Sequence, residues 1–296
     1  MLMQDKYKID AFGVKLDYRI LMVIPLLLLF VSVMVLVNKY VTTGDWFDRS
    51  IELRGGTLLS LKTQGPVSVQ TVENALSTDF GSIAVRGLSG FGTHGVSIQM
   101  SDDVDYEKVI QRLSDSGIDI IDYSLENVGS SLSSVFWSQA QTGIMIAFVL
   151  MGIIALVVFR TVVPSFAIIM SAASDIVITL GMMQVFGIEF SLASLGALLM
   201  LIGYSVDTDI MLTSRLLRER EHGLSMGEKL TSALKTGLTM TLTSIGAMTA
   251  IIIVPLPAVL NDIASVILIG LVADIINTWL FNSVILRWYC EARGIG

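Results

Sequence analysis

Long runs of apolar residues recur along this chain, and they limit what it can fold into. A membrane-spanning helix needs roughly 20 mostly apolar residues to cross a hydrocarbon core of about 30 Å. Six such runs occur, at 20–37, 141–159, 164–186, 190–212, 236–254 and 263–286. Charged residues make up only 15% of the 296 positions, against about 25% in a typical soluble domain. The sequence therefore predicts a polytopic α-helical membrane protein with six transmembrane helices.

The basic residues predict which helix ends face the cytoplasm, because short cytoplasmic segments are enriched in Lys and Arg. They occur before the first run, after the second, after the fourth and after the sixth: Lys6, Lys8, Lys15, Arg19, Arg160, Arg215, Arg218, Arg220, Lys229, Lys235, Arg287 and Arg293. The short segments around Glu189 and Asp262 contain none. The N-terminus (1–19), the loop 213–235 and the C-terminus are therefore predicted to be cytoplasmic in a cell-membrane protein, with helices two to six within 138–296.

The stretch 38–137 is predicted to form one extracytoplasmic domain. It is acidic, with seven Lys or Arg against thirteen Asp or Glu. Its pattern predicts the order β-α-β-β-α-β, which is typical of the ferredoxin-like α+β fold. The predicted strands lie at 51–61, 82–87, 95–100 and 118–126, the helices at 68–76 and 106–114, and a glycine-rich link at 88–94. This negative charge would repel nucleic acid and attract basic segments of a protein that is being transported. The simpler explanation of the acidic composition is an ordinary solvent-exposed surface.

Four Asp residues fall inside the predicted transmembrane helices. Asp175 and Asp274 lie midway along the third and sixth helices, while Asp207 and Asp209 lie in the inner half of the fourth. A carboxylate at a helix centre costs about 2.5–3.5 kcal/mol on insertion scales, so acids at this depth are usually functional. The alternative is that each only hydrogen-bonds across a helix interface. Candidate partners are Ser171, Ser174, Tyr204, Thr239, Thr241, Thr243 and Asn277.

No predicted span contains a Lys or Arg in its core, which leaves the acids without an internal counter-charge. Lys235, at the start of the fifth span, can extend to the cytoplasmic interface. The acids are therefore either partly protonated or matched by positive charge from a partner subunit. Both alternatives favour a role in binding or transferring protons.

The hypothesis is a proton relay with Asp207 and Asp209 as the first titrating groups, Asp175 and Lys235 as their partners, and Asp274 as a further member.

Four short motifs occur in order along the chain. They are LRGGT at 53–57, SAASD at 171–175, GYSVDTDIMLTSR at 203–215 and KTGLTMTLT at 235–243. Together they resemble motifs of the SecF family, in which SecF forms one half of an RND-type transporter and SecD the other. The resemblance places family-motif residues at Arg54, Gly55, Gly56, Thr57, Gly203, Tyr204, Ser205 and Arg215.

The chain departs from the bacterial pattern of this family and is more similar to archaeal members. Ser174 stands where His is usual, and Lys235 stands where Arg is usual. The family's central Asp falls at Thr208, so that Asp207 and Asp209 flank it instead. Asp274 occupies a position where bacterial members tend to have a small residue.

The resemblance implies a subunit that pairs with SecD and assists Sec-dependent protein export, coupled to the proton-motive force. Its implied partners are a SecD-like subunit, the Sec translocon, unfolded exported polypeptides and membrane lipid. An RND-type exporter of small molecules or lipids is the alternative. No enzyme activity or cofactor is expected, because the chain has no P-loop, and the single cysteine, Cys290, rules out a Cys-based metal site. An intramembrane aspartyl protease is also disfavoured, because the Gly-x-Gly-Asp signature is missing.

Overall fold

The chain forms two compact units in a computed structural model, which describes residues 8–11, 14–65, 67–76, 83–90, 93–101, 104–218, 226–254 and 257–294. The first unit comprises Met1–Asp48, Gly143–Glu189 and Ala193–Gly296, and the second comprises Arg49–Thr142 and Phe190–Leu192. The first unit is mainly helical and contains the membrane acids. The second contains a four-stranded sheet.

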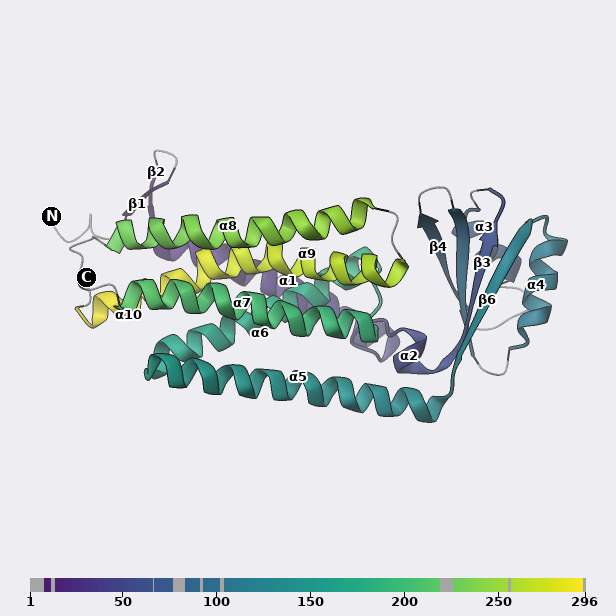
Figure 1. The fold of residues 1–296 in the computed structure, drawn as a ribbon, viewed down its shortest axis with the longest axis horizontal. Coiled ribbons are helices and arrows are strands. Elements are labelled where there is room, and N and C mark those ends of the chain that lie inside the picture. Colours follow the sequence, from purple (N-terminus) through teal and green to yellow (C-terminus); the bar gives the residue numbers. More distant parts are fainter. Residues whose placement is uncertain are drawn as a thin grey trace. The chain divides into compact units, whose positions relative to one another are not determined.

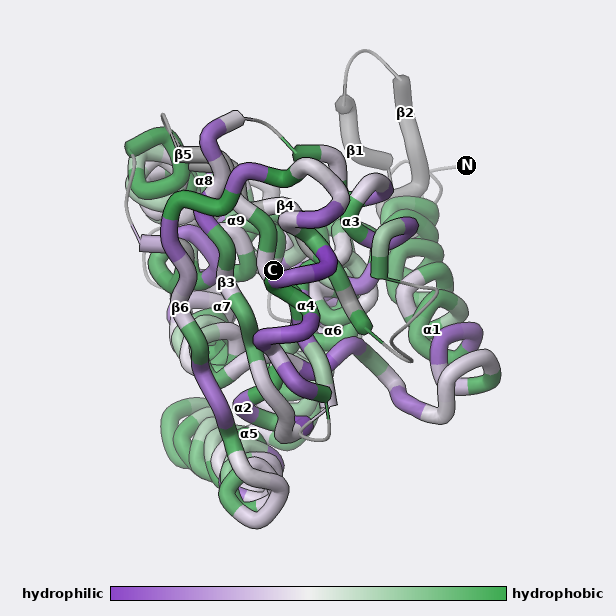
Figure 2. The backbone as a smooth tube through the Cα atoms, turned by 90° about the vertical axis from the view of Figure 1, so that its right-hand side faces the viewer, coloured by the Kyte–Doolittle hydropathy of each residue, from purple (hydrophilic) through white to green (hydrophobic). Residues whose placement is uncertain are grey.

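Six helices in the described part of the chain are long and apolar enough to cross a membrane. They are α1 (Val23–Thr43), α5 (Ser130–Phe159), α6 (Val162–Phe186), α7 (Leu192–Arg218), α8 (Met226–Ile253) and α9 (Ala258–Asn277), which continues through a π-helical turn (Thr278–Asn282) into α10 (Ser283–Ala292). Within the first unit α1 packs on α6, α6 on α9 and α9 on α8 (Figure 1). Figure 2 shows how apolar α1 and α5 are along their lengths. These helices confirm the prediction of a polytopic helical membrane protein.

The helices are longer than the apolar runs that predict them. The predicted loop 213–235 is mostly helical, because α7 continues to Arg218 and α8 begins at Met226. Likewise α1 extends to Thr43 and α5 begins at Ser130, both inside the stretch assigned to the outer domain. Hydropathy marks only the part of a helix that is apolar, whereas residues such as Leu, Arg, Lys and Glu continue a helix readily beyond it.

A glycine allows the close approach of α1 and α6. Gly181 of α6 lies against Ser32 of α1, and a Cβ atom at position 181 would come within 2.6 Å of the Ser32 Cβ. Small residues at membrane helix interfaces permit such backbone proximity. Ahead of α1, a short hairpin of β1 (Lys8–Ala11) and β2 (Val14–Asp17) leads into a 3₁₀ turn at Tyr18–Met22.

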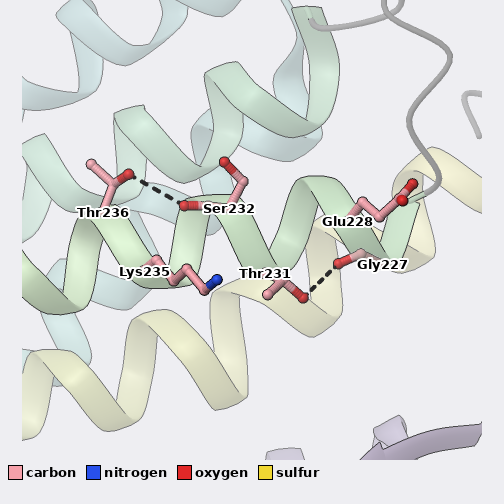
Figure 3. Close-up of a pocket in the computed structure, with 6 residues that line it drawn as sticks. All are labelled: Gly227, Glu228, Thr231, Ser232, Lys235 and Thr236. Atoms are coloured by element: carbon pink, nitrogen blue, oxygen red, sulfur yellow. Dashed lines mark hydrogen bonds between the residues drawn. The ribbon is translucent and has the colours of Figure 1, made fainter.

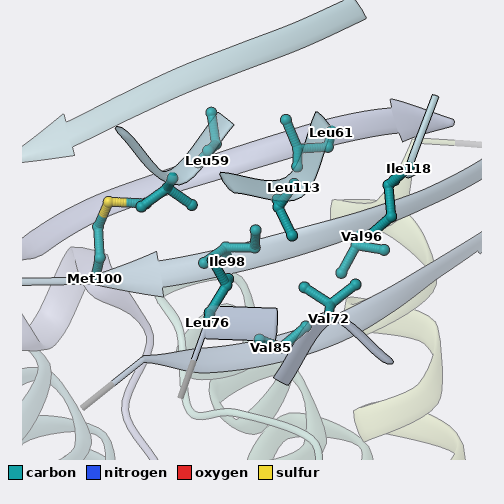
Figure 4. Packing of buried hydrophobic residues seen from close by; sticks show 11 residues of the cluster. Leu59, Leu61, Val72, Leu76, Val85, Val96, Ile98, Met100, Leu113 and Ile118 are labelled. Atoms are coloured by element: carbon teal, nitrogen blue, oxygen red, sulfur yellow. The ribbon is translucent and has the colours of Figure 1, made fainter. Parts of the chain in front are cut away.

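The second unit follows the order β-α-β-β-α-β after one helical turn, α2 (Ile51–Arg54). Its elements are β3 (Gly56–Thr63), α3 (Val69–Leu76), β4 (Ala84–Gly90), β5 (Thr93–Met100), α4 (Tyr106–Asp115) and β6 (Ile120–Val128). The strands pair antiparallel in the order β4-β5-β3-β6. The core comprises Leu59, Leu61, Val72, Leu76, Val85, Val96, Ile98, Met100, Val109, Leu113 and Ile118 (Figure 4). Alternate side chains along β3 are buried, so one face of this strand contributes to the core.

The first strand of this unit begins later than predicted, because two glycines set the chain direction. The strand predicted at 51–61 is a helical turn up to Arg54, and β3 starts at Gly56. Gly55 and Gly56 have φ values of +84° and +126°, which L side chains rarely adopt. A Cβ on Gly56 would also lie 2.7 Å from the Met100 carbonyl oxygen. The glycine-rich link at 88–94 was likewise wrong in extent, since β4 runs to Gly90 and β5 starts at Thr93.

Candidate functional site

Three of the four membrane Asp residues meet inside the helical unit. Asp175 of α6 and Asp209 of α7 are fully buried, and Asp274 of α9 is 1% exposed. Asp274 lies close enough to both other carboxyl groups to interact with them electrostatically. These residues come from three different helices, so the cluster exists only because the helices pack together.

Asp175 is held by side chains from two neighbouring helices. Ser205 Oγ of α7 donates a hydrogen bond of 2.7 Å to Asp175 Oδ2. Asn277 Nδ2 of α9 lies 2.6 Å from Asp175 Oδ1 and 3.0 Å from Ser174 Oγ. Both carboxyl oxygens therefore have donors, and the Asp175 side chain is fixed between α7 and α9.

Thr278 joins the other two acids. Its Oγ1 lies 3.0 Å from Asp209 Oδ1 and 3.1 Å from Asp274 Oδ1. A hydroxyl carries one proton, so Thr278 cannot donate fully to both carboxyl groups at once. Its oxygen accepts from the second group only if that carboxyl is protonated. The geometry therefore suits a pair of acids that together hold an extra proton.

The π-helical turn supplies two of the donors. Asn282 Nδ2 donates to Asp209 Oδ1 at 2.7 Å, so Thr278 and Asn282 reach the same oxygen from opposite ends of the turn. Such single turns inside α-helices occur often at functional sites. The sequence analysis did not single out either residue. The signal was available, because the polar residues Asn277, Thr278, Asn282 and Ser283 interrupt the apolar run 263–286.

The cluster holds its acids without a basic partner. Among the described residues, the groups that hydrogen-bond these three carboxyls are hydroxyls and side-chain amides. Removing an ion from water has a large energetic penalty, and several adjacent negative charges in an apolar interior multiply it. The arrangement can accordingly hold a proton and pass it between neighbouring carboxyl groups. The described residues contain no group of three or more His, Cys, Asp or Glu arranged to hold a metal ion.

Asp207 lies outside this cluster, although it is two positions from Asp209. Successive α-helical residues are rotated by about 100°, so the two carboxylates point to nearly opposite sides of α7. Asp207 is exposed and borders a cavity of about 280 Å³ between α7, α8 and α9. The other residues around this cavity are Tyr204, Thr208, Met240, Thr241, Thr243, Ser244 and Leu271.

Lys235 also lies apart from the buried acids. It is exposed on α8 and lines an open groove of about 630 Å³ with Gly227, Glu228, Thr231, Ser232 and Thr236 (Figure 3). Beside this groove, Arg215 Nη1 of α7 donates to Ser232 Oγ at 2.7 Å.

The other motif residues have separate places in the fold. Ser205 belongs to the acid cluster, Tyr204 borders the cavity and Gly203 is exposed on α7. Arg54 ends α2, Gly55 is its C-cap, and Gly56 is the first residue of β3. Thr57 is buried in β3, where its hydroxyl accepts from Asn127 Nδ2 at 2.7 Å.

These features define a class before any relative is considered: a multi-pass helical membrane protein with carboxyl groups buried at membrane depth. Residues 108–292 match the family described as "Protein export membrane protein SecD/SecF, C-terminal". SecF of Methanothermobacter thermautotrophicus is 41% identical over 282 residues, covering 94% of each chain. SecF of Pyrococcus furiosus is 36% identical over 281 residues, covering 95% of this chain and 94% of its own. The chain belongs to the SecF family of protein-export membrane proteins.

A solved structure shares the fold. SecDF of Thermus thermophilus, a translocon-associated membrane protein, superposes with a TM-score of 0.76 at 22% sequence identity. The match covers 96% of this chain but only 39% of that chain. The shared fold therefore spans nearly all of this chain and about two fifths of the SecDF chain. The resemblance inferred from the four motifs is confirmed.

Proposed function

We propose that this chain is the SecF-type subunit of the protein-export machinery, and that it pairs with a SecD-like subunit in the cytoplasmic membrane. The SecF relatives support the export role, because they match over more than nine tenths of their length. The SecDF structure supports the pairing, because this chain accounts for 39% of that protein. Its partners would be the Sec translocon, exported unfolded polypeptides and surrounding lipid. The named relatives favour this role over a small-molecule or lipid exporter.

The membrane orientation is part of the proposal. Both termini lie in the cytoplasm, and the second unit is a ferredoxin-like domain outside it. The distribution of Lys and Arg supports the orientation. The element order β-α-β-β-α-β and the sheet order β4-β5-β3-β6 support the fold type.

Export is coupled to proton movement through Asp175, Asp209 and Asp274. The observation that carries this proposal is that Thr278 links Asp209 to Asp274 while no Lys or Arg hydrogen-bonds the three acids in the described chain. One proton crossing the membrane releases about 2.3 kcal/mol per 100 mV, enough to bias a packed helix pair between two arrangements. A carboxylate only accepts hydrogen bonds, whereas a protonated carboxyl group also donates one. Protonation of Asp209 or Asp274 therefore changes the hydrogen bonds between α7 and the end of α9, and with them the packing of these two helices.

Asp207 marks the face that the partner subunit covers. Lipid does not solvate an exposed carboxylate at membrane depth, so such groups face protein or a water-filled cavity. Asp207 and the adjoining hydroxyl-lined cavity therefore suit contact with a second membrane subunit. The same surface gives that subunit a route to supply a positive charge, which no described residue of this chain places in hydrogen-bond contact with the buried acids.

The coupling is tested by replacing each buried acid with Asn. Asp175→Asn, Asp209→Asn and Asp274→Asn are expected to reduce export of a secreted reporter by about tenfold or more in cells, since each removes a proton-binding group without changing its shape. Membrane insertion and association with the SecD-like subunit are expected to remain. Asp115→Asn on the surface of α4 serves as the matched control. Normal export by all three buried variants would contradict the proton relay.

A further inference from the structure

The last strand of the sheet, β6, has an edge that no strand of the described chain covers. The order β4-β5-β3-β6 places it at the end of the sheet. Ile121, Tyr123 and Leu125 are 57%, 52% and 40% exposed. Natural sheets protect such edges with Lys, Pro or bulges, because unpaired N–H and C=O groups recruit other strands. β6 contains neither Lys nor Pro. Its pairing with β3 is irregular only near the start of β6, opposite Lys62 and Thr63 of β3.

Apolar and polar residues alternate along much of β6, as the colours of Figure 2 show. Because successive side chains of a strand point to opposite faces, the two faces of β6 differ in chemistry. Tyr123 pairs with Leu61 and Leu125 with Leu59, and both leucines belong to the buried core, so these two apolar side chains lie on the core face of the sheet. The opposite face carries acids.

The acidic face is only partly neutralised from within the sheet. Asp122 lies in register with Lys62 of β3, whereas Glu126 lies opposite Leu58. Both acids are exposed. A strand added at the free edge would therefore meet the apolar side chains of Tyr123 and Leu125 on one face and net negative charge on the other.

The negative charge of Asp122 and Glu126 limits which strands can pair with the free edge of β6. A second copy of β6 would bring a second set of Asp122 and Glu126 alongside the first, and like charges on neighbouring strands are destabilising. An extended segment that alternates apolar residues with Lys or Arg complements both faces. Strand addition relies mainly on backbone hydrogen bonds, so it tolerates many sequences.

We propose that β6 is a docking edge for an extended segment of the exported polypeptide, which adds to the sheet as a fifth strand. Apolar side chains of that segment pack on Tyr123 and Leu125, and its basic side chains face Asp122 and Glu126. The inference rests on the proposed export function, which brings unfolded chain to this domain. Backbone recognition suits a subunit that meets many different exported sequences.

The test measures peptide binding to the full chain in lipid nanodiscs, without export. The probe is a fluorescent peptide that alternates Val and Lys and matches β6 in length. A second peptide has the same sequence with alternate backbone nitrogens methylated, which removes the donors needed for strand addition. Binding is followed by fluorescence anisotropy, and the site by amide hydrogen exchange. The expected result is binding of the first peptide only, with new protection confined to 120–128.

Charge reversal provides the matched variants. The double variant Asp122→Lys/Glu126→Lys is expected to weaken binding of the Val-Lys peptide by roughly tenfold. The control Glu73→Lys/Asp115→Lys makes the same charge change on α3 and α4 and is expected to bind as the parent does.

Several results would overturn the inference. They are equal binding of the methylated peptide, protection away from β6, pairing of two copies through β6, and protection of β6 by the SecD-like subunit before peptide is added. Any of these leaves the export role standing, because that role is tested separately by the buried Asp variants.

Discussion

Thr278 connects two acids of the buried cluster through one hydroxyl group. It contacts Asp209 and Asp274 at 3.0 and 3.1 Å. Asp207 and Asp209 differ in the same way, residue by residue. They are two positions apart on α7, but Asp207 is exposed beside a cavity and Asp209 is fully buried. The role of each carboxyl group follows from the direction of its side chain.

Replacing Thr278 tests the shared hydroxyl directly. Thr278→Val keeps the side-chain shape but removes the hydroxyl that the two buried carboxyl groups share, so it should destabilise the protein by about 1–3 kcal/mol and reduce export. Thr278→Ser retains the hydroxyl and should behave nearly as the parent. Thermal unfolding in detergent and reporter export measure the two effects. Equal losses in both variants would show that packing, not the hydroxyl, matters at this position.

At the scale of elements, the membrane unit depends on close helix contact and on one irregular turn. The π-helical turn between α9 and α10 presents Thr278 and Asn282 to Asp209. The contact of Gly181 with Ser32 brings α1 against α6, the helix that carries Asp175. Helix packing and local helix geometry therefore set the position of the cluster together.

A pair of glycine substitutions separates helix packing from helix propensity. Gly181→Ala should destabilise the protein by about 1–3 kcal/mol, since the added methyl group would overlap Ser32 of α1. Gly246→Ala on α8, where a Cβ meets no atom within 4 Å, should be neutral or stabilising by up to about 1 kcal/mol. Thermal unfolding of both variants in the same detergent compares them. A neutral Gly181→Ala would contradict tight α1–α6 packing.

At the scale of the whole molecule, three observations bear on the proposed pairing with a SecD-like subunit. No Lys or Arg hydrogen-bonds the buried acids in the described chain, Asp207 is exposed on a membrane-length helix, and the chain matches 39% of the SecDF chain. The proposed subunit would account for all three. The proposed orientation places the second unit outside the cytoplasm and the groove on α8 at the cytoplasmic side of the membrane.

Cysteine labelling in intact cells tests that orientation. The parent protein should be unreactive, because Cys290 is buried. Ser114→Cys on the exposed surface of α4 should react with a membrane-impermeant maleimide added from outside. Thr231→Cys, exposed in the groove on α8, should react only after the membrane is permeabilised. The reverse pattern would place the termini outside and contradict the proposal.

The sequence predicted the six helices and the family, because both depend on information that is local in the chain. A membrane span is set by the length of one apolar run, and the family by four short motifs. Helix ends were less predictable, since hydropathy does not register the polar turns that extend α7 and α8. The strand predicted at 51–61 was wrong at its start because the positive φ values of Gly55 and Gly56 form a turn there.

By itself the sequence determined that four acids lie inside apolar runs of membrane-spanning length and that no Lys or Arg lies in the cores of those runs. Only the tertiary structure decided that Asp175, Asp209 and Asp274 meet while Asp207 and Lys235 lie elsewhere. The physical reason is that a carboxylate's partners depend on its direction around a helix axis and on which other helices pack there. Thr278 and Asn282 approach Asp209 across about 70 positions of sequence, and only the packing of α7 and α9 brings them together.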